Sequence, residues 1–184
     1  MKKVEHGKTF DRNAANPPAF EIFHNTVTEG YPEHWHTAIE IIMPTRGEYE
    51  VVVGKDSYNL KEGDIIMINS GVVHGMRFVS QGERIVMLVE PGCVENQEEM
   101  ETIFLRLPAI YFKKEDEEDP FYLFLRSQIL ELVREYDNEG AVMTHRICTG
   151  LKELFSEFGR KGFSDANAQN TFGAMKQQEY IEAG

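Results

Sequence analysis

The sequence has few of the residues that would crosslink a small protein or anchor it in a membrane. Its 184 residues include only two cysteines, Cys93 and Cys148, which lie far apart without a metal-binding motif around them. This spacing is typical of two reduced thiols rather than of a disulfide framework or a zinc site. No apolar run is long enough to cross a bilayer, and none follows the charged N-terminus as a signal peptide requires. We therefore expect a cytoplasmic protein without a membrane partner.

Positive charge is also scarce. The chain has 19 Lys and Arg residues against 31 Asp and Glu residues, which gives a formal net charge of −12. This charge repels the phosphates of a nucleic acid, and no basic stretch is long enough to form a positive groove. We expect that these residues do not bind DNA by themselves.

The first half of the sequence is rich in short apolar segments separated by turn residues. The expected strands cover residues 20–25, 34–42, 48–53, 58–60, 64–69, 74–79 and 84–90. Many short strands of this kind predict a barrel or jelly-roll. The hydrophobic content of 41% is sufficient for its core.

The hydrophobic period becomes helical after Pro91. A first helical segment covers 95–106, and two longer amphipathic helices are expected over 120–138 and 142–158. Asp119 is expected to cap the first of these two, with proline at the next position. Two helices joined by a few residues predict an antiparallel hairpin that covers the barrel or a second subunit.

We expect this hairpin to form a homodimer interface. Its large apolar residues offer more surface than the flank of one small barrel is expected to cover. Leu132 and Leu151 are the positions expected in the seam between two subunits.

Four residues have the side chains and the spacing of a metal site. If residues 34–42 form one strand, His34, His36 and Glu40 share one face of it. The opposite face then carries Trp35, Thr37, Ile39 and Ile41. His74, from a later strand, is the natural fourth ligand in the mouth of a barrel.

Two motifs carry these residues. The first is His-x-His-x3-Glu-x6-Gly over 34–47, and the second is Gly-x5-Asn-x-Gly-x2-His over 63–74. Together they resemble the motifs of the cupin superfamily, in which two histidines, a glutamate and a later histidine surround a metal. Three departures from that pattern leave the ligands intact: the position of Gly30, and Asn69 and Phe78 in place of the usual proline and asparagine.

The amino-acid sequence around the motifs, over roughly residues 20–160, is similar to the N-terminal sensor domains of AraC-type transcription regulators. The resemblance implies a cupin barrel (double-stranded β-helix or jelly-roll), mainly β, followed by a helical hairpin. It also implies four segments: an N-terminal arm at 1–19, the barrel at 20–92, a helical dimerisation region at 93–163, and at 164–184 a linker with the start of a truncated DNA-binding domain.

The resemblance predicts a function without catalysis. The barrel is expected to sense a small-molecule effector, for which a sugar is one candidate, while DNA is reached only through a C-terminal domain absent from this chain. Residues 176–182 resemble the opening of the first helix of such a domain. The alternative is a stand-alone metal-dependent cupin enzyme, a dioxygenase or an isomerase, whose metal binds substrate at open positions.

The sequence does not determine which metal binds. Imidazole and carboxylate ligands suit nickel, zinc, iron, manganese or cobalt, and the sequence does not choose among them. The same residues could instead line a metal-free effector pocket, although a buried Glu40 would then need compensating hydrogen bonds or a shifted pKa.

Overall fold

The structure is a computed structural model that describes residues 19–26, 30–93, 108–114, 118–138 and 140–161. Three sequence-based expectations lie outside these residues. They are the arm up to residue 18, the helical segment at 95–106 and the C-terminal segment at 164–184.

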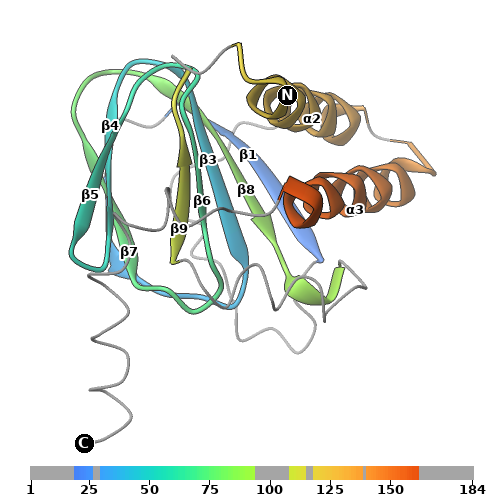
Figure 1. Cartoon of the computed structure of the whole chain (residues 1–184), viewed down its shortest axis with the longest axis horizontal. Helices are drawn as coiled ribbons and strands as arrows, with labels where there is room; N and C mark the ends of the chain where they lie inside the picture. Colours follow the sequence, from blue (N-terminus) through green and yellow to red (C-terminus); the bar gives the residue numbers. More distant parts are fainter. Residues whose placement is uncertain (1–18, 27–29, 94–107, 115–117, 139, 162–184) are drawn as a thin grey trace, which may run out of the picture.

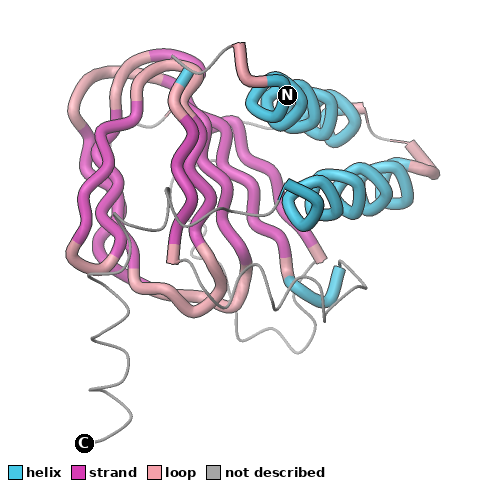
Figure 2. Tube along the Cα trace, in the orientation of Figure 1, coloured by secondary structure: helices cyan, strands magenta, loops and turns pink. Residues whose placement is uncertain are grey.

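Two antiparallel sheets face each other in the described part of the chain (Figures 1 and 2). One sheet has the strand order β1-β8-β3-β6-β9 and the other β2-β7-β4-β5. The strands are β1 Phe20–Asn25, β2 Tyr31–His34, β3 Ile39–Arg46, β4 Tyr49–Val53, β5 Asp56–Leu60, β6 Ile65–Ile68, β7 His74–Phe78, β8 Glu83–Val89 and β9 Ala109–Phe112. A short 3-10 helix, η1 (Pro91–Cys93), follows β8. The predicted mainly β barrel is confirmed.

Side chains of the five-stranded sheet point alternately to its two faces, and each face packs in a separate hydrophobic core. Its inner face packs on the four-stranded sheet through residues such as Ile42, Ile66 and Ile68. Its outer face packs on the helices through Ile39, Ile41, Ile65, Met67, Ile85 and Met87. Glu40 lies between two outward-facing residues of β3, so its carboxylate is on the interior side of the barrel.

The helical hairpin is also confirmed, and it covers the outer face of the five-stranded sheet (Figure 2). Helix α2 spans Pro120–Asp137 and helix α3 spans Met143–Lys161. Asp119 caps α2 as expected, because its side chain accepts a hydrogen bond from the Phe121 backbone N–H at 2.8 Å. Arg146 of α3 forms an ion pair with Glu135 near the end of α2. None of the described helices is long and apolar enough to span a membrane.

The expectation that Leu132 and Leu151 lie in a subunit seam is wrong. Leu132 is 2% exposed and Leu151 is fully buried in the outer core of the same chain. The sheet offers a wide apolar face of its own, so it covers helical residues that the sequence analysis assigned to a partner.

Strand β9 was not predicted. It pairs with β6, with Ile65 opposite Phe112 and Ile68 opposite Ala109, so the five-stranded sheet extends beyond residue 92. The strand has only four residues, too few for a period of two to stand out, and the sequence on either side of it predicts helices.

Candidate metal centre

The single strand expected over 34–42 is wrong, and this changes how the candidate ligands are positioned. Strand β2 ends at His34 and strand β3 begins at Ile39, and the two strands belong to different sheets. Residues 35–38 cross between the sheets. His34 is therefore supplied by one sheet, His36 by the crossing segment and Glu40 by the other sheet.

The four candidate ligands nevertheless come together. One ligand atom from each of His34, His36, Glu40 and His74 lies within 4.8 Å of the others. His74 is the first residue of β7 and pairs with His34 across the β2–β7 ladder. His36, Glu40 and His74 are buried, whereas His34 is the most exposed of the four.

The crossing segment is held in place by both neighbouring loops. The Gly71 backbone N–H donates to the His36 carbonyl at 2.8 Å. This hydrogen bond links the turn of the second motif to the first motif. Gly71 has φ of 74°, a backbone conformation that favours glycine. Thr37 donates its hydroxyl to the Glu90 carboxylate at the end of β8.

Two departures from the cupin pattern have local structural reasons. Asn69 donates its backbone N–H to the Pro108 carbonyl at 2.9 Å, a bond that a proline at residue 69 could not make. This bond fixes the start of β9. A Cβ on Gly30 would lie 2.5 Å from the Met76 carbonyl oxygen, so only glycine fits that close approach to β7.

All three histidines have the same tautomer imposed on them. Their Nδ1 atoms lie 2.8–2.9 Å from backbone carbonyls: His34 to Pro32, His36 to Ala38 and His74 to Val72. A carbonyl can only accept, so each Nδ1 carries the hydrogen. In the neutral ring, Nε2 then presents a lone pair, which is the arrangement found in histidines that bind metals.

These lone pairs face another acceptor. His36 Nε2 and His74 Nε2 lie 2.9 and 3.1 Å from the same carboxylate oxygen, Glu40 Oε2. With neutral rings and an ionised carboxylate, acceptors face acceptors at hydrogen-bond distance, which is unfavourable without protons or a cation between them. The arrangement therefore calls for positive charge at this point.

A metal ion supplies that charge more readily than protons do. The ring centroids of His34 and His36 lie 4.5 and 4.8 Å from that of His74. Several imidazolium cations this close would repel one another, and burial weakens the screening by water. One divalent cation satisfies three nitrogen lone pairs and a carboxylate together, so this donor set fits a metal.

Three exposed apolar side chains lie next to candidate ligands, in the sequence or in space. Trp35 is 64% exposed, because it lies on the crossing segment and not on a strand face as expected. Val73, directly before His74, is 45% exposed, and the Tyr31 ring centroid lies 6.4 Å from that of His34. We call Tyr31, Trp35 and Val73 the apolar rim.

One charged residue inside the barrel was not predicted from the sequence. Arg84 of β8 is fully buried, and its Cζ lies 4.8 Å from the Tyr49 ring centroid and 5.9 Å from the Tyr31 ring centroid. Contacts of this kind between a guanidinium and an aromatic face are attractive. The signal was present in the alternation of β8: Arg84 shares its parity with Leu88, which pairs with Glu40.

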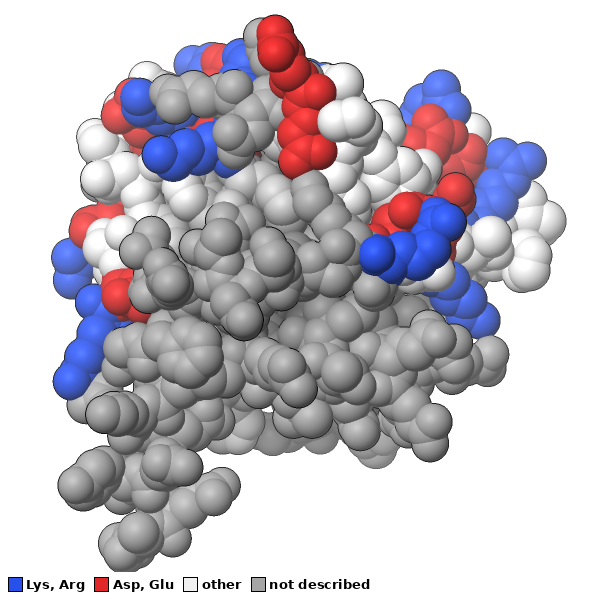
Figure 3. Space-filling model, viewed as in Figure 1, with Lys and Arg blue, Asp and Glu red and all other residues white. Residues whose placement is uncertain are grey.

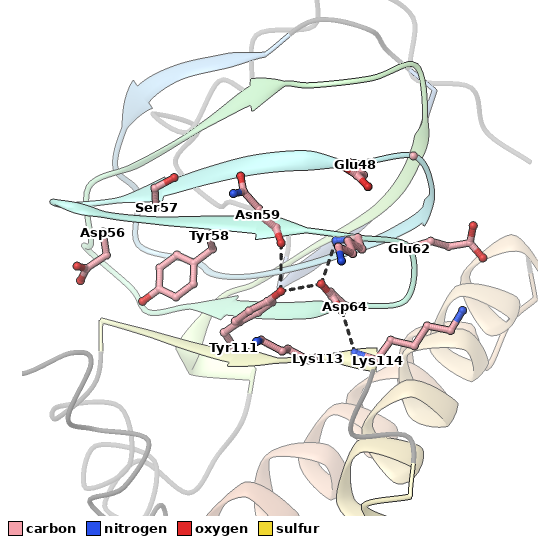
Figure 4. Close-up of a pocket in the computed structure, with 12 residues that line it drawn as sticks. Glu48, Asp56, Ser57, Tyr58, Asn59, Glu62, Asp64, Tyr111, Lys113 and Lys114 are labelled. Carbon is pink, nitrogen blue, oxygen red and sulfur yellow. Dashed lines mark hydrogen bonds between the residues drawn. The ribbon is translucent and has the colours of Figure 1, made fainter.

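A second hollow, of about 1000 Å³, opens between the edge strands β5 and β9 (Figure 4). At its base the buried Asp64 carboxylate accepts hydrogen bonds from the backbone N–H groups of Lys61 and Lys114 and from the Tyr111 hydroxyl. These bonds already use the carboxylate to join the two edges. We therefore assign Asp64 a structural role.

Comparisons with known proteins agree with this architecture. The family model described as "Cupin domain" matches residues 25–90. None of the curated proteins matches the sequence. A structure of apo ToxT from Vibrio cholerae is similar over 83% of this chain and 60% of ToxT, with 11% identity and a TM-score of 0.55.

Two further solved structures are similar over the barrel region. A cupin-2 domain containing protein from Shewanella frigidimarina matches over 41% of this chain and 76% of that chain, with 16% identity and a TM-score of 0.37. A mutant of Bacillus subtilis oxalate decarboxylase matches over 39% and 21%, with 18% identity and a TM-score of 0.36. The chain thus spans less than two thirds of ToxT and of the decarboxylase, and the likeness concerns the fold alone. All four candidate ligands lie within the residues that match the cupin domain model, and two helices follow this region in the chain.

Proposed function

We propose that this chain is the effector-sensing and dimerisation part of an AraC-type transcription regulator that uses a metal-loaded cupin barrel. The main supporting observation is a barrel that holds a concentrated polar site and carries a helical hairpin packed on its outer face. The similarity in fold to ToxT spans both parts, because it covers 83% of the chain. The sequence resemblance to AraC-type sensors spans the same two parts.

His34, His36, Glu40 and His74 would hold the metal, whose Lewis acidity would bind an oxygen atom of the effector. The apolar rim would contact the remainder of that molecule. An amphipathic small molecule with neighbouring oxygen atoms suits these surroundings, and a sugar or a sugar derivative is the first class to test.

The proposed homodimer would use the outer surface of α2. Leu123 and Leu130 are 50% and 38% exposed and lie seven residues apart, which places them on one side of the helix. Exposed apolar side chains in such a row favour a symmetric contact with a second copy.

DNA contact would come from a helix-turn-helix domain in a longer protein of the cytoplasm. The net charge of −12 on this chain repels DNA phosphates, which favours DNA contact by a separate domain. On the face shown in Figure 3, the described Lys and Arg side chains lie in small groups beside Asp and Glu. Reading the gene beyond codon 184 tests this part: a basic helical continuation supports it, and a stop codon contradicts it.

A metal-dependent cupin enzyme is the second candidate. The complete set of three imidazoles and one carboxylate favours it, because such a site can polarise a substrate oxygen as well as hold an effector. Of the polar residues next to the ligands in the sequence, Glu33 is exposed and the Thr37 hydroxyl donates to Glu90, and we assign neither as a general acid or base.

One experiment separates the two functions. The purified chain is loaded with each candidate metal and mixed with a panel of sugars and sugar acids, and its melting temperature and the mass spectrum of each ligand are recorded. A sensor raises its melting temperature and returns the ligand unchanged, whereas an enzyme converts it. The control is the double variant His36→Ala, His74→Ala. Metal-dependent conversion would overturn the regulator proposal in favour of the enzyme.

A further inference from the structure

The two cysteines, which are 55 residues apart in the sequence, meet in the fold. Cys93 Sγ and Cys148 Sγ lie 3.4 Å apart, close to van der Waals contact, and both are free thiols. Their spacing in the sequence did not predict this contact, because no motif links them. The fold brings them together where the barrel ends and α3 begins.

The two cysteines lie on elements from different parts of the fold. Cys93 ends η1 directly after β8, and Cys148 lies in the second turn of α3, next to the fully buried Ile147. Both thiols are partly buried and pack against the outer core between the sheet and the helices. A bond between them would fasten α3 to the end of β8 (Figure 1).

We propose that Cys93 and Cys148 form a reversible disulfide that fastens the helical hairpin to the barrel when the protein meets a peroxide. One thiol loses its proton, its thiolate attacks a peroxide oxygen, and the O–O bond breaks to leave a sulfenic acid and a hydroxide, which takes up that proton to become water. The second thiol loses its proton, its thiolate attacks the sulfenic sulfur, and the S–O bond breaks to release a hydroxide, which takes up the second proton to become a second water. The two sulfurs lose two electrons, and the peroxide gains them.

The surroundings make this a slow but selective reaction. Burial, together with the hydrogen bond to Cys148 and its charge, raises the pKa of Cys93 to about 12, while nearby Lys152 opposes the shift. The thiolate, which is the reactive form, is therefore scarce at neutral pH. Once one sulfur is oxidised, the other is already in contact with it, so closure of the disulfide precedes further oxidation.

The inference is independent of the metal centre and of the regulator proposal. It requires only two thiols in contact and a peroxide that accepts their two electrons. A closed loop of this length restricts the unfolded chain strongly, so the oxidised protein should melt at a higher temperature.

The test treats the purified chain with hydrogen peroxide and measures free thiols, intact mass, linked peptides and melting temperature. We expect two thiols to disappear, the mass to fall by about 2 Da, and a peptide pair containing Cys93 and Cys148 to appear. The melting temperature should rise by roughly 5–10 °C. Dithiothreitol should reverse all four changes.

The single variants Cys93→Ser and Cys148→Ser provide matched controls, with Cys93→Ala and Cys148→Ala as replacements if a serine variant fails to fold. In each, peroxide should add oxygen atoms to the remaining thiol or link two chains, and the melting temperature should not rise. If the unsubstituted chain itself gains oxygen atoms, links chains, or keeps both thiols at excess peroxide, the proposal is overturned.

Discussion

His74 begins a strand of one sheet and Glu40 lies in the other sheet, yet His74 Nε2 is only 3.1 Å from Glu40 Oε2. The same oxygen faces His36 at 2.9 Å. Glu40→Gln keeps the shape of the side chain and removes its charge. Substitution of residues that only support metal ligands typically weakens affinity 10- to 100-fold, so loss of this carboxylate should weaken it at least about 100-fold. Isothermal titration with each candidate metal measures this.

The matched control for this substitution is Glu33→Gln, because Glu33 is exposed and lies directly before His34. It removes the same charge near the site without touching a ligand. If the Glu40→Gln variant and the unsubstituted chain bind the metal with equal affinity, Glu40 is not a metal ligand.

Trp35 should report metal binding directly. It is the only tryptophan of the chain and lies between His34 and His36. Copper, nickel or cobalt bound to these histidines should quench its fluorescence in a saturable way, whereas zinc, with a filled d shell, should quench it little. Quenching that rises without saturation, or persists in the double variant His36→Ala, His74→Ala, would contradict binding at this site.

The proposed dimer should depend on the exposed leucines of α2. Leu123→Glu and Leu130→Glu should each shift the chain from dimer to monomer at micromolar concentration, because a charge would enter an apolar contact. Analytical ultracentrifugation measures the shift. Val142→Glu is the control, since Val142 is more exposed than either leucine but lies outside α2. If the unsubstituted chain sediments as a monomer at micromolar concentration, the proposed dimer is contradicted.

Leu132→Glu separates dimer loss from unfolding. Leu132 is 2% exposed in the outer core, so its replacement by a charge should unfold the chain rather than only dissociate it. Circular dichroism distinguishes the two results.

The sequence identified the four candidate ligands for a reason that was partly wrong. Strand parity placed His34, His36 and Glu40 on one face of one strand, but the chain crosses between two sheets after His34. The motif spacing was the reliable signal, because it reflects the whole crossing and not one strand. Parity did work within β3, where Glu40 faces inward between Ile39 and Ile41.

Local signals worked best where a single residue determines the local structure. Asp119 and the proline after it define the start of α2 in the sequence and in the structure. The contacts between Cys93 and Cys148, and between Arg84 and Tyr49, depend instead on how distant segments pack. No local pattern contains that information.

The pKa of Cys93 predicts how its labelling depends on pH. The folded-state pKa, about 12, lies above the ordinary value of 9.0, so the thiol stays protonated in the fold where it would ionise in the unfolded chain. In the unsubstituted chain, iodoacetamide labelling of the Cys93 peptide, followed by mass spectrometry, should be slow at pH 8 and about tenfold faster with each added pH unit up to pH 10. In urea the rate should be higher and should level off near pH 9. A plateau near pH 9 in the folded chain would contradict the shift.

Asp64 should be needed for stability rather than for binding. Its carboxylate is buried and accepts bonds from Lys61 N at 2.9 Å, Lys114 N at 2.8 Å and the Tyr111 hydroxyl at 2.6 Å (Figure 4). Asp64→Asn replaces one accepting oxygen by an NH2 group, which then faces a donor. We expect the free energy of unfolding in urea to fall by about 2–4 kcal/mol. Glu62→Gln, an exposed neighbour, should change it by less than about 0.5 kcal/mol. Equal losses in both variants would show that charge, and not these three bonds, determines the effect.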